Sequence, residues 1–439
     1  MISTFILKII NFFKGFDSSY SIKNKSQKEA NDIQLRLLKN LISKSDKTKF
    51  GIEHNFKKIN SYSEYIKNVP VRDYEKIKKY IELIKDGEKD ILWPGKPMYF
   101  AKTSGTTSGI KYIPITKESL KNQINSASYL LLNYLNEQKS IKSIKGKVMF
   151  ISGSPNLDNK NNIKIGRLSG IVNYHEPSYL KKILLPSKKT NKIDDWEKKI
   201  DKIVDETIGQ DLRILGGIPP WVQMYFDVLT KKTGKKIKDI FPNLELLCHG
   251  GVNFEPYRAK LFETVGKKVD SIETYPASEG FIAYQDSQVA EGLLLLADTG
   301  IFFEFIPADE YFNENPTRLS IEEVELNVNY ALIINSNAGL WGYSIGDTVK
   351  FISKYPYRLL VTGRIKHFIS AFGEHVIGEE VEKAMKLVCA KYAETELVEF
   401  TVAPHVTPDE GLPHHEWLIE FAHLPENVEA FANDLDEEL

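Results

Sequence analysis

The sequence predicts an α/β fold with a large N-terminal domain, residues 1–364, and a small α+β C-terminal domain, residues 365–439. Three observations predict it. Short apolar runs in the middle of the chain end at glycine-rich or Tyr-Pro turns and alternate with helical patterns, which is typical of parallel strands with flanking helices. Strand patterns dominate between residues 292 and 352, which adds a β-rich subdomain and makes mixed sheets expected. After Arg364 the pattern changes to helix, two strands and helix.

Composition describes an ordinary globular chain without a dominant charge. Its 439 residues suffice for two or three domains, and 58 Lys and Arg against 59 Asp and Glu give a formal net charge of −1. No field therefore favours nucleic acid or an anionic membrane. The apolar stretch 1–16 is too short to span a bilayer and favours a docking helix over a signal peptide. Two distant cysteines favour a reducing compartment, so we expect a cytoplasmic protein without a membrane span.

Helical periodicity marks the first part of the chain. Residues 27–45 carry apolar side chains at helical spacing, and the break at Pro70 precedes a second amphipathic helix that starts at Tyr74. Thr116 is expected to cap a long helix. Its apolar positions are Leu120, Ile124, Ala127, Leu130 and Leu131.

Strands are expected next. In the middle of the chain they cover 147–151, 212–215, 244–248 and 269–273, and in the β-rich part 293–296, 301–306, 323–326, 331–334 and 348–352. The small domain is expected to contain a helix from residue 379, strands at 398–402 and 416–421, and a last helix from about residue 425. The apolar stripe of that last helix is Val428, Phe431, Leu435 and Leu439.

The stretch from Thr103 to Lys111 combines five hydroxyl side chains, two glycines and a lysine in nine positions. Glycine lets backbone N–H groups turn toward an anion, and hydroxyls and a lysine add donors and positive charge. Its flanks, 98–101 and 112–115, have strand patterns, whereas the P-loop opens a helix. The stretch therefore fits a polyphosphate site of another kind, or equally a polar hairpin turn without a ligand.

Three further clusters carry groups suited to a nucleotide. In 273–280, Glu279 is suited to a hard cation that bridges phosphates, and Tyr275 to stacking on a base. In 343–347, Asp347 is suited to both hydroxyls of a ribose. In 362–367, Arg364 is suited to clamping a ribose or phosphate at the domain boundary. Taken alone, each cluster is explained as well or better by a polar turn or a surface ion pair.

The order of these motifs resembles the ordered set of the adenylate-forming superfamily. Within it, the chain resembles the auxin-responsive promoter family, the Gretchen-Hagen-type acyl acid–amido synthetases, in a bacterial-like form. The resemblance runs from about residue 30 to the end. It is carried by residues 103–114, 250–257, 273–285, 340–347 and 363–376, with 69–84 and 92–95 as a lead-in.

This resemblance implies a large adenylate-forming domain and a small mobile C-terminal domain. It implies an enzyme that uses ATP and Mg²⁺ to activate a carboxylic acid as acyl-AMP, with release of pyrophosphate. The amine of an amino acid then attacks, which gives an amide and AMP. The expected partners are thus a carboxylic acid and an amino acid, with no nucleic acid.

The resemblance also implies roles for individual residues. Lys111 and Glu279 are the expected catalytic residues, with Glu279 as the metal ligand. The expected nucleotide-binding residues are Ser104, Gly105, Thr106, Thr107, Ser108, Gly251, Tyr275, Ser278, Asp347 and Arg364. Val252, Phe281 and Tyr284 are the expected residues of the acid site.

The chain departs from the family pattern in two places. The family's C-terminal domain continues further and carries a lysine in a glycine-rich segment, which has no counterpart before Leu439, so we expect an incomplete small domain. His367 stands where many relatives of the superfamily have an acidic residue. Two alternatives therefore stay open: transfer of the acyl group to a thiol such as coenzyme A, and a catalytically impaired protein that binds a nucleotide or an acid.

Overall fold

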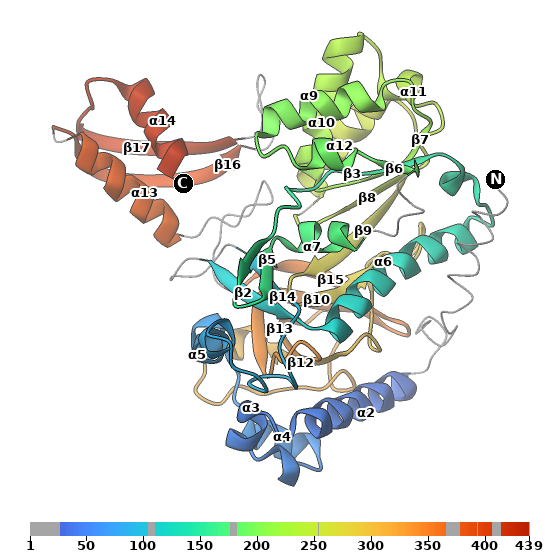
Figure 1. The fold of residues 1–439 in the computed structure, drawn as a ribbon, viewed down its shortest axis with the longest axis vertical. Helices are drawn as coiled ribbons and strands as arrows, with labels where there is room; N and C mark the ends of the chain where they lie inside the picture. The colour runs from blue at the N-terminus through green and yellow to red at the C-terminus, as the bar shows by residue number, and fades with distance from the viewer. Residues whose placement is uncertain are drawn as a thin grey trace.

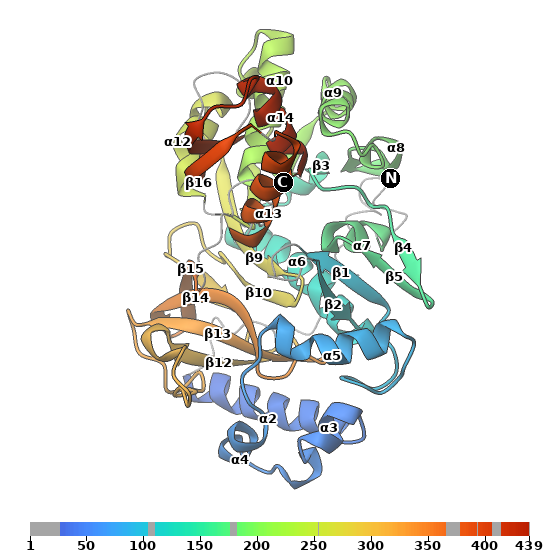
Figure 2. The ribbon, with the colours of Figure 1, turned by 90° about the vertical axis from the view of Figure 1, so that its left-hand side faces the viewer.

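The fold is described from a computed structural model, which covers residues 27–103, 110–175, 182–252, 254–365, 378–392, 394–405 and 414–438. Its centre is an eleven-stranded sheet in the order β12-β13-β14-β15-β11-β10-β9-β8-β7-β3-β6. Helices cover the sheet (Figures 1 and 2), and the C-terminal elements stand beside the main body (Figure 1). The predicted α/β fold with mixed sheets is confirmed.

The part of the sheet from β9 to β6 is parallel and is covered on both faces. It comprises β3 (Lys147–Phe150), β6 (Leu184–Leu185), β7 (Leu212–Gly216), β8 (Leu246–Gly250) and β9 (Asp270–Ala277). Successive side chains of a strand point to opposite faces. Met149, Leu215 and Leu247 accordingly pack with α9 (Trp196–Thr207), α10 (Pro219–Thr233) and α12 (Glu255–Val265). Val148, Ile214 and Leu246 pack on the other face with α6 (Lys117–Glu137).

The remaining part of the sheet, from β12 to β10, is antiparallel. It comprises β10 (Gly280–Tyr284), β11 (Leu293–Leu295), β12 (Ile301–Pro307), β13 (Asn329–Ser336), β14 (Tyr343–Lys354) and β15 (Tyr357–Arg364). The predicted strand at 323–326 is wrong. The backbone N–H and the hydroxyl of Ser320 both donate to the Glu323 carboxylate at 2.7 Å, which closes a turn there, and only an isolated bridge joins Leu326 to Phe351.

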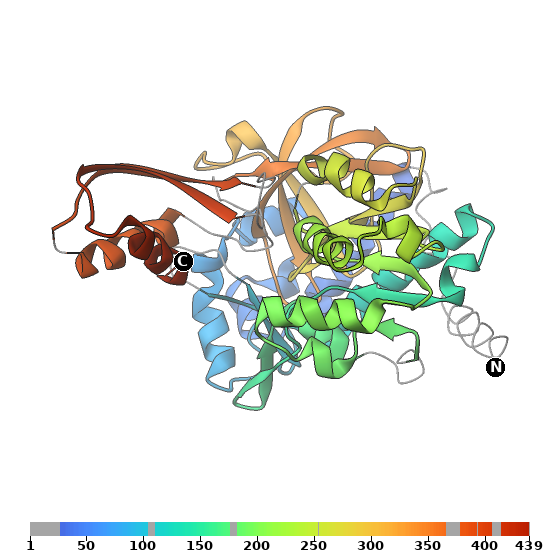
Figure 3. The ribbon, with the colours of Figure 1, turned by 90° about the horizontal axis from the view of Figure 1, so that it is seen from above.

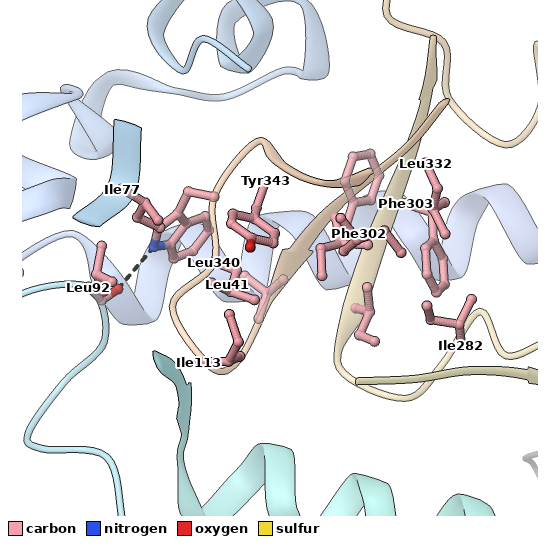
Figure 4. Packing of buried hydrophobic residues seen from close by; sticks show 14 of the residues in the cluster. Leu41, Ile77, Leu92, Ile113, Ile282, Phe302, Phe303, Leu332, Leu340 and Tyr343 are labelled. Atoms are coloured by element: carbon pink, nitrogen blue, oxygen red, sulfur yellow. Dashed lines mark hydrogen bonds between the residues drawn. The ribbon is translucent and has the colours of Figure 1, made fainter. Parts of the chain in front are cut away.

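The N-terminal helices pack against this antiparallel half. They are α2 (Gln27–Ser45), α3 (Lys49–Glu53), α4 (Tyr62–Asn68) and α5 (Tyr74–Lys85), so both predicted helices are confirmed. Figure 4 shows side chains from distant segments meeting in this core, among them Leu41, Ile77 and Phe302. The indole N–H of the fully buried Trp341 donates to the Leu92 carbonyl at 2.9 Å.

A buried ion pair lies between α4 and β12. Glu304 is fully buried, and both of its carboxylate oxygens accept hydrogen bonds from Arg318 at 2.8 Å. The Tyr62 hydroxyl donates to Glu304 at 3.0 Å, and the Asn335 amide donates to it at 2.7 Å. Arg318 also donates to the Val69 carbonyl beyond the end of α4. The buried charges thus have hydrogen-bond partners, which low dielectric surroundings require.

The loop that is rich in hydroxyl groups joins two paired strands. β1 (Tyr99–Thr103) and β2 (Lys111–Ile115) are antiparallel, with Thr103 opposite Lys111, in a small sheet of order β2-β1-β5-β4 with β4 (Asp158–Lys160) and β5 (Ile163–Gly166). The predicted strand flanks are therefore confirmed. Thr116 caps α6 with a reciprocal capping box to Ser119, as its sequence position predicts.

The C-terminal elements have a hydrophobic core of their own. A hairpin of β16 (Glu396–His405) and β17 (His414–His423) packs with α13 (Gly378–Lys391) and α14 (Val428–Glu438), apart from the large sheet (Figure 3). Met385, Val388, Phe431 and Leu435 are buried there, whereas Val428 is 55% exposed and lies outside the stripe expected for it.

The described helices include none that is both long and apolar enough to cross a membrane. The docking helix expected at 1–16 lies outside the described residues, as does His367.

Candidate active site

Lys111 opens β2 at the edge of the hydroxyl-rich loop, while Ser104, Gly105, Thr106, Thr107 and Ser108 lie outside the described residues. The neighbouring Tyr112 backbone N–H donates to the hydroxyl of Tyr74 at 2.9 Å. Because Tyr74 is buried in α5, this bond fixes the start of β2. Burial lowers the pKa of Lys111, and the nearby Glu279 carboxylate opposes that shift.

Glu279 lies in a tight turn between β9 and β10. Ala277 and Gly280 are paired, so Ser278 and Glu279 form a two-residue hairpin turn. At Gly280 a Cβ atom would lie 2.3 Å from the end of the Ile301 side chain, which would have to shift to admit another residue. The amide N–H of the buried Gln123 on α6 donates to the Ala277 carbonyl at 3.0 Å and ties the turn to the helix.

The charge of Glu279 in this turn interacts with that of Lys111 at the start of β2. Burial raises the pKa of Glu279, while the Lys111 ammonium lowers it and Asp347 adds to the rise. A cation at Lys111 and an anion at Glu279 therefore stabilise each other in half-buried surroundings. The two expected catalytic residues lie in one electrostatic cluster, although 168 positions separate them in the sequence.

Asp347 joins this cluster from β14. It is opposite Arg364 in the β14–β15 register, and Arg364 Nε lies 3.0 Å from Asp347 Oδ1. The Tyr275 hydroxyl donates to Asp347 Oδ2 at 2.6 Å. Burial raises the pKa of the Asp347 carboxyl, whereas Arg364, Tyr275 and Lys111 lower it. The sheet thus unites three of the residues that the sequence placed in separate motifs.

The Gly250-Gly251 turn lies at the end of β8, next to β9. Gly250 is opposite Thr274, and a Cβ at Gly250 would lie 2.2 Å from the Thr274 carbonyl oxygen. Gly251 has φ +85°, a conformation that favours glycine. Val252 follows, half-buried. These three residues lie at the carboxyl edge of the parallel strands, where ligands bind in open α/β sheets.

Of the two aromatic residues expected for the acid site, only one lines a cavity. Phe281 lines a small cavity beside Glu279, but Tyr284 does not belong to its described lining. Both rings are buried in the cluster that α6 forms with the sheet. The described lining is mostly polar and consists of Ser119, Asn122, Gln123, Ser126, Glu279, Gly280, Phe281, Thr299, Ile301 and Asn337.

Sequence reasoning missed Gln123 and Tyr74 as supports of the site. The helical pattern assigned the α6 core face to Ile124 and Ala127, yet Ala127 is exposed and Gln123 is buried. A polar residue between Leu120 and Leu130 on the same face was the available signal. Tyr74 was recognised only as a core residue of its helix.

His249, which precedes the glycine turn, is a buried neutral histidine. It is 6% exposed, and its ring stacks on Phe254 with 3.8 Å between centroids. Burial, helped by Arg258, lowers the pKa of His249 to about 3. The charged form is therefore disfavoured in the folded protein.

The burial of neutral His249 predicts that the folded state loses stability at acidic pH. In the unfolded chain a histidine has a pKa near 6.5, so the unfolded state binds an extra proton as the pH falls below about 6.5. The free energy of unfolding should fall by up to about 1.4 kcal/mol per pH unit between about pH 6 and pH 4 through this group. Urea unfolding of the parent and of His249→Asn at several pH values measures it. The exposed His414→Asn serves as control, and equal pH slopes in all three proteins would contradict the prediction.

The fold is similar to those of two solved ligase structures. The solved structure of a 2-hydroxyisobutyryl-CoA ligase in complex with 2-HIB-AMP and CoA is similar, with a TM-score of 0.63 and 12% identity, over 94% of this chain and 83% of that one. The GH3.15 acyl acid amido synthetase is similar with a TM-score of 0.65 and 16% identity, over 93% of this chain and 82% of that one.

The chain belongs to the GH3 family. The family's N-terminal domain matches residues 22–174 and 154–269, its central domain matches 294–364, and its C-terminal domain matches 379–439. A curated relative, the jasmonoyl–L-amino acid synthetase JAR4 of Nicotiana attenuata, is 22% identical over 88% of this chain and 78% of its own length. The indole-3-acetic acid-amido synthetase GH3.15 of Arabidopsis thaliana is 40% identical over a segment of 17% of this chain and 14% of its own. The resemblance found in the motifs is confirmed.

Proposed function

We propose that this chain is an acyl acid–amido synthetase, which joins a carboxylic acid to the amine of an amino acid at the expense of ATP. The observation that carries this is the convergence of Lys111, Glu279, Asp347 and Arg364 near the carboxyl end of β9 in a GH3-family chain. The amido synthetases named among its relatives support the reaction class.

In the first step, a carboxylate oxygen of the acid attacks the α-phosphorus of ATP. The bond from that phosphorus to the bridging oxygen breaks, and pyrophosphate leaves. The loop 104–108 and Lys111 would hold the β- and γ-phosphates, with Tyr275, Ser278 and Gly251 near the adenosine and α-phosphate. Lys111 would stabilise the charge that accumulates on the phosphates in the transition state.

Asp347 would accept the ribose hydroxyls, with Arg364 beside it. Val252 and Phe281 would border the acid, and Tyr284 would support Phe281 from the core. A small cavity beside Glu279 and Phe281 is consistent with this placement.

Glu279 is the residue suited to Mg²⁺. The described residues include no group of three or more His, Cys, Asp or Glu side chains that could hold a metal ion. Magnesium usually keeps one or two carboxylates and takes its other ligands from phosphates and water, so the single half-buried Glu279 carboxylate near Lys111 fits. When bound, the ion would neutralise phosphate charge.

In the second step, the amine attacks the acyl carbon, the bond to AMP breaks, and the amine loses a proton. An acyl-adenylate hydrolyses in water, so the site must close. Arg364 ends β15 immediately before the segment that leads to α13, and we propose movement of the domain 365–439 about this point.

The products separate this function from its runner-up. The parent protein is incubated with ATP, Mg²⁺ and a panel of carboxylic acids, with a pool of amino acids or with coenzyme A, and the products are identified by mass spectrometry. The proposal expects an acyl amino acid together with AMP. An acyl-CoA without amide would establish the thioester alternative, which the fold of the CoA ligase favours. Tight nucleotide binding without either product would establish the catalytically impaired alternative.

A further inference from the structure

The hydroxyl of Tyr275 has a structural task that the sequence did not indicate. It donates to Asp347 Oδ2 at 2.6 Å, and the side chain is only 8% exposed. The ring packs in the large hydrophobic cluster together with Ile282 and Tyr343. A ring that stacks on a base needs an open face, and so little exposure leaves Tyr275 poorly placed for that role.

Asp347 is held from both sides. Arg364 Nε lies 3.0 Å from Oδ1, and the Tyr275 hydroxyl binds Oδ2. An ionised carboxylate offers about four acceptor positions, so after the bonds to described residues each oxygen keeps one position for a further donor. Two donors on different oxygens also fix the plane of the group, which a single donor would leave free to rotate. Asp347 itself is 8% exposed, so its charge depends on these hydrogen bonds.

We infer that Tyr275 is a positioning residue for ribose recognition. Its hydroxyl and Arg364 fix the Asp347 carboxylate so that one acceptor on each oxygen faces the 2′- and 3′-hydroxyls of a ribonucleotide. This inference rests on the proposed function and deepens it, because it assigns discrimination between ribose and deoxyribose to a hydroxyl that need not touch the nucleotide.

The test is equilibrium binding, which does not require turnover. The affinities of the parent and of Tyr275→Phe for ATP, 2′-deoxy-ATP and 3′-deoxy-ATP are measured by titration calorimetry. The substitution keeps the aromatic ring and removes only the hydroxyl. A hydrogen bond to a charged group is strong, so we expect ATP to bind the variant about tenfold more weakly, with a much smaller change for the deoxynucleotides. The ratio of the affinities for ATP and for the deoxynucleotides should therefore be closer to one in Tyr275→Phe than in the parent.

Tyr225→Phe is the matched control. Tyr225 is fully buried on α10, and its hydroxyl shares a 2.7 Å hydrogen bond with Thr207, within a different hydrophobic cluster. Its loss should leave the preference for ribose unchanged. A second variant, Asp347→Asn, should lower ATP affinity, and adding Tyr275→Phe to it should then have little further effect.

Three outcomes overturn the inference. One is a Tyr275→Phe variant that weakens ATP and deoxy-ATP equally, because that marks a purely structural or stacking role. Another is that the losses in the free energy of ATP binding caused by Tyr275→Phe and by Asp347→Asn add fully in the double variant. The third is a parent protein that binds ATP but does not distinguish it from deoxy-ATP. A parent protein that does not bind ATP at all overturns the proposed function as well, which separates the two failures.

Discussion

Replacement of Lys111 by alanine should abolish most of the adenylation activity. Lys111 begins β2, is half-buried, and lies close to Glu279, Asp347 and Arg364. Its ammonium would stabilise charge on the phosphates where little water competes, and removing one such preorganised donor typically costs about 10²–10³ in rate. Acid-dependent exchange of labelled pyrophosphate into ATP measures the loss in Lys111→Ala.

Lys102→Ala is the control for this variant. Lys102 lies on the paired strand β1, where its ammonium binds the exposed Asp158 at 2.5 Å. An exposed pair of this kind contributes little, so exchange should stay within about twofold of the parent. If Lys111→Ala retained more than about a tenth of the parent rate, the role of Lys111 in phosphate binding would be wrong.

Replacement of Arg318 by methionine should destabilise the large domain by about 3–5 kcal/mol. The substitution leaves the Glu304 carboxylate fully buried without its cation, and breaking a buried pair from one side costs about this much. It also removes the hydrogen bond to the Val69 carbonyl, which ties α4 to the sheet. Urea unfolding followed by circular dichroism gives the free energy of unfolding.

Two further variants separate the charge from the packing. Glu304→Met combined with Arg318→Met removes both charges and should recover part of the lost stability, because no buried charge remains unpaired. Arg213→Met breaks a pair with the exposed Asp211 and should cost less than about 1 kcal/mol. A loss of under about 1 kcal/mol in Arg318→Met would contradict the account of this core.

Much of the fold followed from sequence patterns, because the apolar runs are local. The α2 and α5 helices, the Thr116 cap and the two strands that flank the hydroxyl-rich loop were all predictable from periodicity and capping residues. The strand expected at 323–326 failed because alternation of Glu and apolar residues also suits a turn. There the Ser320 hydroxyl and backbone N–H bind the Glu323 carboxylate, a local competition that periodicity does not report.

The order of the motifs gave a set of candidate site residues, but not how they contact one another. Tyr275 and Asp347 are 72 residues apart, and their hydrogen bond depends on how β9 and β14 are placed in one sheet. The same holds for Gln123, whose tie to the Ala277 carbonyl spans 154 residues. Such contacts follow from strand order and register, which short-range patterns leave open.

The central claim is that this site converts ATP and a carboxylic acid into an acyl-adenylate. Exchange of labelled pyrophosphate into ATP, measured for the parent protein with and without each member of a broad acid panel, tests it most directly. The account predicts exchange that appears only when a suitable acid is present and that is lost in Lys111→Ala and Glu279→Gln. The absence of exchange with every acid, or exchange that these two substitutions leave unchanged, would contradict it.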